Sequence, residues 1–168
     1  QEFMQAVNGE YPDITMLMTF GYGITGLKGD RSQAPYGLLK NLLDGMYDVA
    51  APRTTIVDAY EGAYPFRKCS QFAQARQAVK QDMLDFTGAP EQYRRHNRVA
   101  FGIWMDMDFR RFGWHTNAAD FEANYFLPEE FEYSVFCGLR NSDQYVWIYT
   151  EKPLWWQHTR APYAYRRA

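Results

Sequence analysis

Short apolar runs alternate along the chain with longer amphipathic segments, the order expected of strands and helices in turn. The runs rich in strand-forming residues lie at 13–20, 54–60, 98–106 and 143–150. Apolar residues recur at helical spacing from 1 to 8, from Pro35 to Met46, from 70 to 86 and from 128 to 137. Pro128 and the acidic residues after it are typical of a helix start, and we expect the segment Gly88–Ala89–Pro90 to end the helix at 70–86.

Strands that alternate with helices predict a parallel sheet in an α/β fold. A (β/α)₈ TIM barrel needs about 250 residues, so a chain of 168 residues would hold its last four βα units. We favour this half barrel because the first helix lacks a preceding strand and long loops follow the strands. Residues 1–157 would then be the C-terminal part of a barrel domain, with its N-terminal half as a partner, and 158–168 a C-terminal tail. A doubly wound parallel sheet is the alternative.

The alternation of side chains predicts which residues of the last two strands face the inside of such a barrel. In the third strand the helix-facing set is apolar: Val99, Phe101, Ile103 and Met105. Trp104 and Asp106 then face inward, followed by Asp108. In the fourth strand the inner face holds Trp147, Tyr149 and Glu151.

The second strand is ambiguous. Asp58 and Tyr60 share one face of it and Glu61 belongs to the other, so either acid could enter a site. Three neighbouring strand ends therefore carry carboxylates, and a pair of carboxylates is what glycoside hydrolysis requires. The candidate catalytic residues are Asp58, Glu61, Asp106 and Glu151. The candidate substrate-binding residues are Tyr60, Trp104, Asp108, His115, Trp147, Tyr149 and Trp155.

The same acids allow other interpretations. Any one of them could cap a helix or pair with Arg110 or Arg111. Asp106 and Asp108 with His115 could instead hold a cation, as in a metal-dependent hydrolase, although the three histidines of the chain lack ligand spacing. We expect no cofactor and no resident metal.

Composition narrows the function classes. A formal net charge of −2 gives no electrostatic signature of binding to nucleic acid or to an anionic membrane, and no apolar run approaches the roughly 20 residues that span a bilayer. Aromatic residues make up 18% of the chain, and flat rings suit the apolar faces of sugars as well as cores.

Cys69 and Cys137 fit no zinc or redox spacing, so we expect two buried thiols in separate helices. The cysteines leave the compartment open, with a secreted or periplasmic location favoured.

Two segments carry a family resemblance. The stretch from Asp143 to Trp156, with the preceding residues from Asn124 to Tyr133, resembles the last βα unit of glycoside-hydrolase-like barrel proteins from environmental bacteria. The similarity runs from about Ile14 to Trp156 and implies a carbohydrate-directed TIM barrel. In many retaining members of such barrels the acid lies on strand four and the nucleophile, usually Glu, on strand seven. Strand seven here would end in Asp106.

The resemblance and the acids together predict a hydrolase of glycosidic bonds. A non-catalytic carbohydrate-binding barrel, which keeps the aromatic residues without a competent acid pair, is an alternative from another class.

Overall fold

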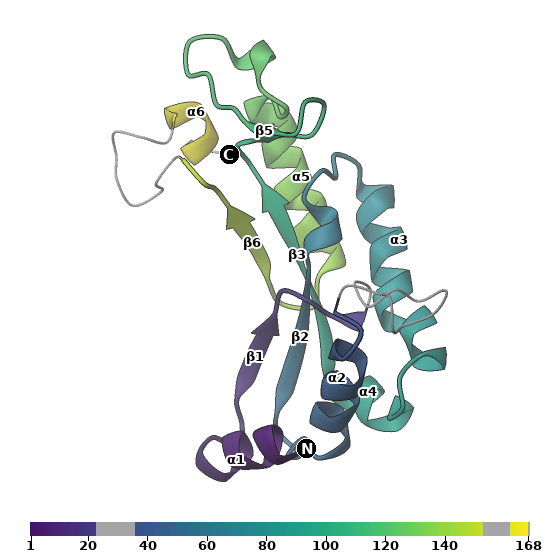
Figure 1. The fold of residues 1–168 in the computed structure, drawn as a ribbon. Helices are drawn as coiled ribbons and strands as arrows, with labels where there is room; N and C mark the ends of the chain where they lie inside the picture. Colours follow the sequence, from purple (N-terminus) through teal and green to yellow (C-terminus); the bar gives the residue numbers. More distant parts are fainter. Residues whose placement is uncertain (23–35, 153–161, 168) are drawn as a thin grey trace.

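The computed structural model describes residues 1–22, 36–152 and 162–167. Its centre is a four-stranded parallel sheet in the order β1-β2-β3-β6 (Figure 1). The strands are β1 (Thr15–Met18), β2 (Thr55–Tyr60), β3 (Asn97–Trp104) and β6 (Val146–Tyr149). The sheet is curled into half of a barrel, so the predicted α/β class and the parallel sheet are confirmed.

Six α-helices belong to the described part of the chain. They are α1 (Glu2–Glu10), α2 (Leu39–Asp48), α3 (Cys69–Lys80), α4 (Pro90–His96), α5 (Pro128–Asn141) and α6 (Tyr163–Arg167). Short 3₁₀ turns η3, η4 and η5 cover Glu61–Ala63, Asp82–Asp85 and Phe121–Ala123. A small antiparallel hairpin joins β4 (Met107–Asp108) to β5 (Gly113–Trp114).

The main helices cover one face of the sheet. Val99, Phe101 and Ile103 of β3 pack with the apolar side chains of α3 and α5, as the alternation predicts. Ile56 of β2 packs with residues of α2 and α4. Figure 1 shows α2, α3, α4 and α5 together to the right of the strands. A doubly wound sheet has helices on both faces and a reversal of strand order, so that alternative is wrong for the described residues.

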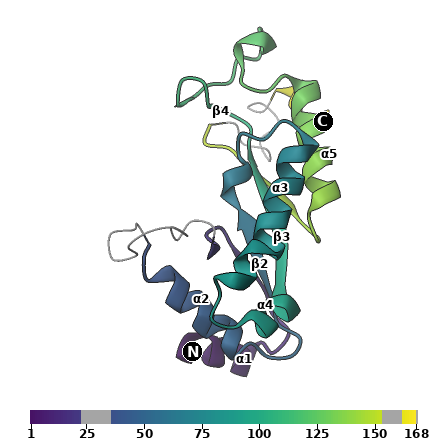
Figure 2. The same cartoon turned by 90° about the vertical axis from the view of Figure 1, so that its right-hand side faces the viewer.

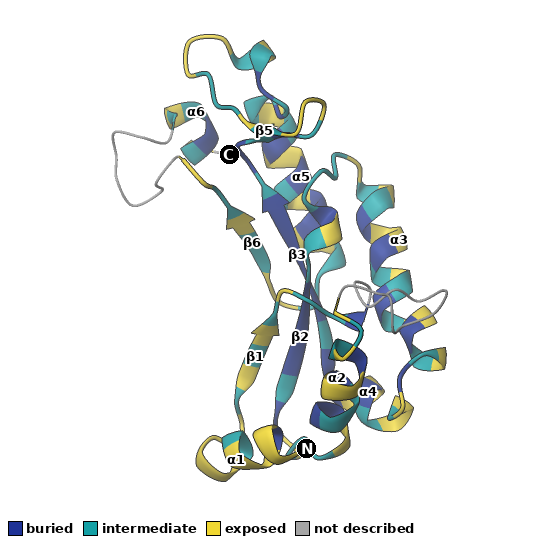
Figure 3. Cartoon of the chain, viewed as in Figure 1, coloured by how far each residue is buried: buried dark blue, intermediate teal, exposed yellow. Residues whose placement is uncertain are grey.

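The face away from the helices carries small side chains. Val57, Ala59 and Ala100 form a separate buried cluster there, against which Trp147 packs. Figure 3 shows the two central strands as mostly buried, whereas the edge strands β1 and β6 are intermediate or exposed. Within the described residues, β1 and β6 are therefore the two edge strands of the half barrel.

Two helices were not predicted. Pro90 does not mark the end of a helix but is the first residue of α4, a position that proline favours because its missing N–H is not needed there. The expected C-terminal tail contains α6, whose Tyr165 is buried and donates a hydrogen bond to the carbonyl of Phe126. Tyr165 thus packs into the same core as Phe131 and Cys137 of α5.

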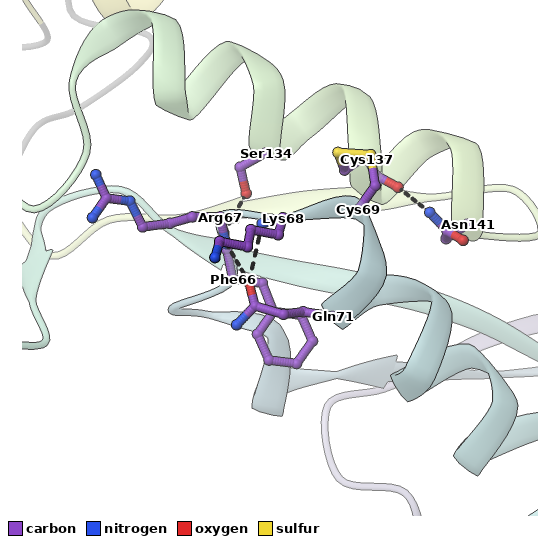
Figure 4. The surroundings of a disulfide bond; sticks show 8 residues. All are labelled: Phe66, Arg67, Lys68, Cys69, Gln71, Ser134, Cys137 and Asn141. Atoms are coloured by element: carbon purple, nitrogen blue, oxygen red, sulfur yellow. Dashed lines mark hydrogen bonds between the residues drawn. A yellow bond between two sulfur atoms is a disulfide. The ribbon is translucent and has the colours of Figure 1, made fainter.

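Cys69 and Cys137 lie in separate helices, as expected, but they are not free thiols. They form a disulfide that joins the first residue of α3 to the third turn of α5, with a Cα–Cα distance of 4.7 Å (Figure 4). Beside it, the Ser134 hydroxyl donates a 2.6 Å hydrogen bond to the carbonyl of Phe66. The two helices that cover β3 are therefore tied together covalently.

None of the described helices has the length and apolar character needed to cross a bilayer.

Candidate functional site

A pocket of about 290 Å³ opens at the carboxyl ends of β1 and β2. Its walls come from the residues that follow β1 and from the end of β2 with the η3 turn. The lining residues are Thr19, Gly21, Asp58, Tyr60, Glu61, Gly62 and Tyr64. Three residues predicted for the site, Asp58, Tyr60 and Glu61, are thus brought together.

Asp58 is the buried acid of this pocket. Its side chain is 4% exposed, and its Oδ1 atom has no hydrogen-bond partner among the described residues. Burial favours the neutral form of a carboxyl group, and it raises the pKa of Asp58 to about 7. Asp58 can therefore carry a proton near neutral pH, which an exposed aspartate does not.

Gly21 makes room for Asp58. A Cβ atom at position 21 would overlap the Asp58 carboxyl group, so the chain after β1 can close over this acid only with a glycine. Asp58 lies on the same side of β2 as Ile56, the side that faces the helices, and this position explains the burial of its carboxyl group. Val57 lies on the opposite, lumenal side. The sequence left this choice open, and the structure gives Asp58 the helix-facing position with access to the pocket.

Glu61 lies at the first position of η3, immediately after β2. One of its carboxylate oxygens accepts a 2.7 Å hydrogen bond from the hydroxyl of Tyr64. Burial and the neighbouring Glu61 carboxylate raise the pKa of the Tyr64 hydroxyl, which keeps this tyrosine a donor. The pocket thus holds a second carboxyl group whose orientation is fixed by a neighbouring side chain.

Four aromatic rings continue the site from Tyr64 across the sheet to β6. We call Tyr64, Trp104, Trp147 and Tyr149 the ring cluster. The Tyr64 ring lies 5.3 Å from that of Trp104, 5.4 Å from that of Trp147 and 6.1 Å from that of Tyr149, between centroids. A Cβ atom on Gly102 would lie 2.7 Å from the rings of both Trp147 and Tyr64, so this glycine of β3 lets the rings rest on the strand.

Glu151 stands at the far side of the ring cluster. It accepts a hydrogen bond from the hydroxyl of Tyr149, and this bond raises the pKa of that hydroxyl. Glu61 also acts electrostatically on Tyr149. Two Tyr–Glu pairs, Tyr64 with Glu61 and Tyr149 with Glu151, therefore flank the same cluster, as the inner-face assignment of Tyr149 and Glu151 anticipated.

Asp106 is buried below Glu151 and its oxygens are occupied. It accepts hydrogen bonds from the indole N–H of Trp104 at 3.0 Å and from the main-chain N–H groups of Glu151 at 3.1 Å and Lys152 at 3.0 Å. These contacts fix the turn that carries Glu151. The structure thus gives Asp106 a positioning role, whereas its catalytic role stays a prediction.

The predicted metal alternative does not fit the described residues. Asp108 forms a two-point ion pair with Arg110 at 2.9 and 3.0 Å, which lowers the pKa of the aspartate. His115 lies after β5, where its main-chain N–H donates to the carbonyl of Asp106 and its buried Nε2 atom has no hydrogen-bond partner among the described residues. No three His, Cys, Asp or Glu side chains gather as metal ligands in the described ranges. Asp108 thus forms an ion pair within the β4–β5 hairpin, and its predicted role in substrate binding stays a prediction.

Sequence reasoning missed Tyr64 and Gly21. Tyr64 follows a strand end within the segment Ala63–Tyr64–Pro65–Phe66, and its position next to Glu61 was the available signal. For Gly21 there was no such signal, because nothing in the sequence ties it to Asp58. Trp155, the remaining predicted binding residue, lies outside the described residues.

Comparison of the chain with family models, with curated proteins and with solved structures gives no match. The function is therefore inferred from the site alone.

Proposed function

We propose that the chain is the C-terminal half of a TIM-barrel glycoside hydrolase, with Asp58 and Glu61 as its catalytic carboxyl groups. The observation that carries the proposal is the buried Asp58, whose Oδ1 atom has no hydrogen-bond partner among the described residues and which shares a pocket with Glu61 at the carboxyl ends of parallel strands. This end of the strands is where barrel enzymes keep their catalytic residues. A strongly shifted acid in a concave pocket is a common mark of a functional site.

The two acids suit the two roles in glycoside hydrolysis. Asp58, protonated near neutral pH because of its burial, would donate its proton to the glycosidic oxygen as the bond to the anomeric carbon breaks. Glu61, held by Tyr64, would either take a proton from the attacking water or attack the anomeric carbon itself. Neither step needs a cofactor.

The aromatic side chains suit a sugar ligand. Tyr60 and Tyr64 line the pocket, and the ring cluster leads from it to Glu151. Rings bind the apolar faces of sugars, and a few carboxylates with fixed orientation bind their hydroxyl groups. In this proposal Glu151 contacts sugar hydroxyls across the ring cluster from the catalytic pair, and Asp106 holds Glu151 in place.

A panel of aryl glycosides and polysaccharides tests the proposal on the complete protein. We expect turnover of at least one substrate, and a loss of at least about 100-fold in Asp58→Asn and in Glu61→Gln. Asp13→Asn is the matched control, because Asp13 forms only an exposed ion pair before the start of β1. Sugar binding without turnover would instead favour a non-catalytic carbohydrate-binding barrel. Turnover unchanged in both site variants would refute the catalytic assignment.

A further inference from the structure

The outer face of α5 carries an exposed stripe that no described element covers. Its members are Glu129, Tyr133, Phe136 and Arg140, all exposed, and the spacing of four, three and four residues keeps them on one side of the helix. The opposite side of α5 packs on the sheet through Phe131, Ser134 and Cys137. In Figure 2, α5 lies at the outer edge of the helix layer with α3 on its inner side.

Contacts between neighbouring side chains of α5 hold the stripe in place. The rings of Tyr133 and Phe136 are stacked, with centroids 6.2 Å apart and an interplanar angle of 23°. The guanidinium of Arg140 lies over the Phe136 ring, 5.6 Å from its centroid. Tyr133 and Phe136 remain 50% and 49% exposed, and Leu139 beside them 55%. Two large rings are thus held in place at the surface in a manner that leaves half of each exposed to water.

The charges of the stripe make it complementary to itself. Glu129 stands at the helix start and Arg140 near its end, with the two rings between them. If a second α5 lies antiparallel across a two-fold axis, Glu129 faces Arg140 of the other copy and Tyr133 faces Phe136 of the other copy. Both pairs occur twice, as two-fold symmetry requires.

The surface around Glu129 can receive the incoming arginine. Glu129 and Glu132 line a hollow of about 380 Å³ between α5 and α6, together with Tyr163 and Arg167. The guanidinium groups of Arg166 and Arg167 lie over the Tyr163 ring on the α6 side of this hollow, and the two carboxylates lie on its α5 side. An arginine from a second copy that reaches Glu129 would therefore meet a carboxylate on the α5 side.

We propose that two copies of this chain associate through antiparallel α5 helices, with the stripe as the interface. The surface lies on the side of α5 opposite the sheet, so the interaction depends neither on the catalytic proposal nor on closure of the barrel. One helix of 14 residues is about 21 Å long, and such a contact falls at the small end of protein interfaces. The expected dissociation constant is in the micromolar range or weaker.

Charge reversal tests the pairing by sedimentation velocity over protein concentrations from about 5 to 500 µM. Glu129→Arg and Arg140→Glu should each shift the monomer–dimer equilibrium toward monomer by at least about 10-fold, because like charges then face each other twice. The double variant Glu129→Arg/Arg140→Glu restores opposite charges and should recover the wild-type dimer. Arg95→Glu makes the same change in net charge as Arg140→Glu, but on α4 at the other end of the helix layer (Figure 1), and should leave the equilibrium unchanged.

The outcomes separate this partner from any other. A wild-type monomer at every concentration overturns the proposal and leaves the stripe to a different partner. A dimer that tolerates both single reversals also overturns it, because the contact then lies elsewhere. Circular dichroism of each variant shows that α5 is intact, which is expected because both charged side chains are exposed.

Discussion

At the scale of single residues, burial decides the chemistry of Asp58. The carboxyl group lies under Gly21 and between β2 and the helices, with no hydrogen-bond donor on Oδ1 among the described residues. Water would stabilise the ionised form, but Asp58 is only 4% exposed to it. The proton is therefore retained to a pH of about 7.

The raised pKa predicts how stability depends on pH. Well below pH 3.8, its ordinary pKa, Asp58 is protonated in the folded and the unfolded state. Between this pKa of 3.8 and about 7 only the unfolded chain ionises, so the free energy of unfolding falls as the pH rises, by up to about 4 kcal/mol. Above pH 7 this contribution is constant.

Asp58→Asn removes this titration and nearly keeps the shape of the side chain. Urea unfolding at several pH values should show the variant gaining stability relative to wild type between pH 4 and 7, and a constant difference above pH 7. A difference that does not change over this range would mean that Asp58 ionises normally in the folded protein.

The sequence predicted the orientation of side chains correctly in strands where one face is uniformly apolar. The apolar set Val99, Phe101 and Ile103 identified the helix-facing side of β3, and the inner positions of Trp147 and Tyr149 followed from the same rule. Both faces of β2 mix polar and apolar residues, so alternation alone could not orient Asp58. Contacts between distant segments, such as Gly21 on Asp58, leave no periodic signal.

At the scale of elements, the disulfide between α3 and α5 supplements packing on β3. The bond links two cysteines that are 68 residues apart in the sequence and so closes a loop of that length. Such a crosslink reduces the freedom of the unfolded chain, and the loop length corresponds to about 4 kcal/mol in the entropic description. Disulfides persist mainly in oxidising compartments, which agrees with the favoured secreted or periplasmic location.

Removal of both sulfurs tests that contribution. Cys69→Ala/Cys137→Ala should lower the free energy of unfolding by about 4 kcal/mol relative to the oxidised wild type. Urea unfolding measures it, and the variant should not respond to added reductant whereas wild type should. Equal stability of the two proteins would show that packing alone holds α3 and α5 together.

The elements that sequence reasoning missed are short. α4 has seven residues and α6 five, too few for a periodic pattern to stand out. Pro90 was interpreted as a terminator because proline both ends and begins helices. Only the tertiary setting, in which Tyr93 packs into the core beside α2, distinguishes the two roles.

At the scale of the whole molecule, the sheet is half a barrel with its carboxyl ends on one side. The order β1-β2-β3-β6 and the helices on a single face follow the alternation of elements along the chain, which is why this part of the fold was predictable. The closure of a full barrel was inferred from the first helix without a preceding strand, from the long loops after the strands and from the family resemblance. Among the described residues, no strand pairs with the outer sides of β1 and β6, and further parallel strands there would satisfy their backbone groups.

The catalytic proposal places the reacting bond of the substrate at this carboxyl end, between Asp58 and Glu61. A crystal structure of the complete protein carrying Asp58→Asn, with a bound oligosaccharide identified by the substrate panel, measures that position directly. We expect one sugar ring in the pocket, the glycosidic oxygen within about 2.6–3.2 Å of the side chain at position 58, and the next sugar over the ring cluster toward Glu151. An oligosaccharide bound away from this pocket, with neither Glu61 nor position 58 in contact with it, would contradict the proposal.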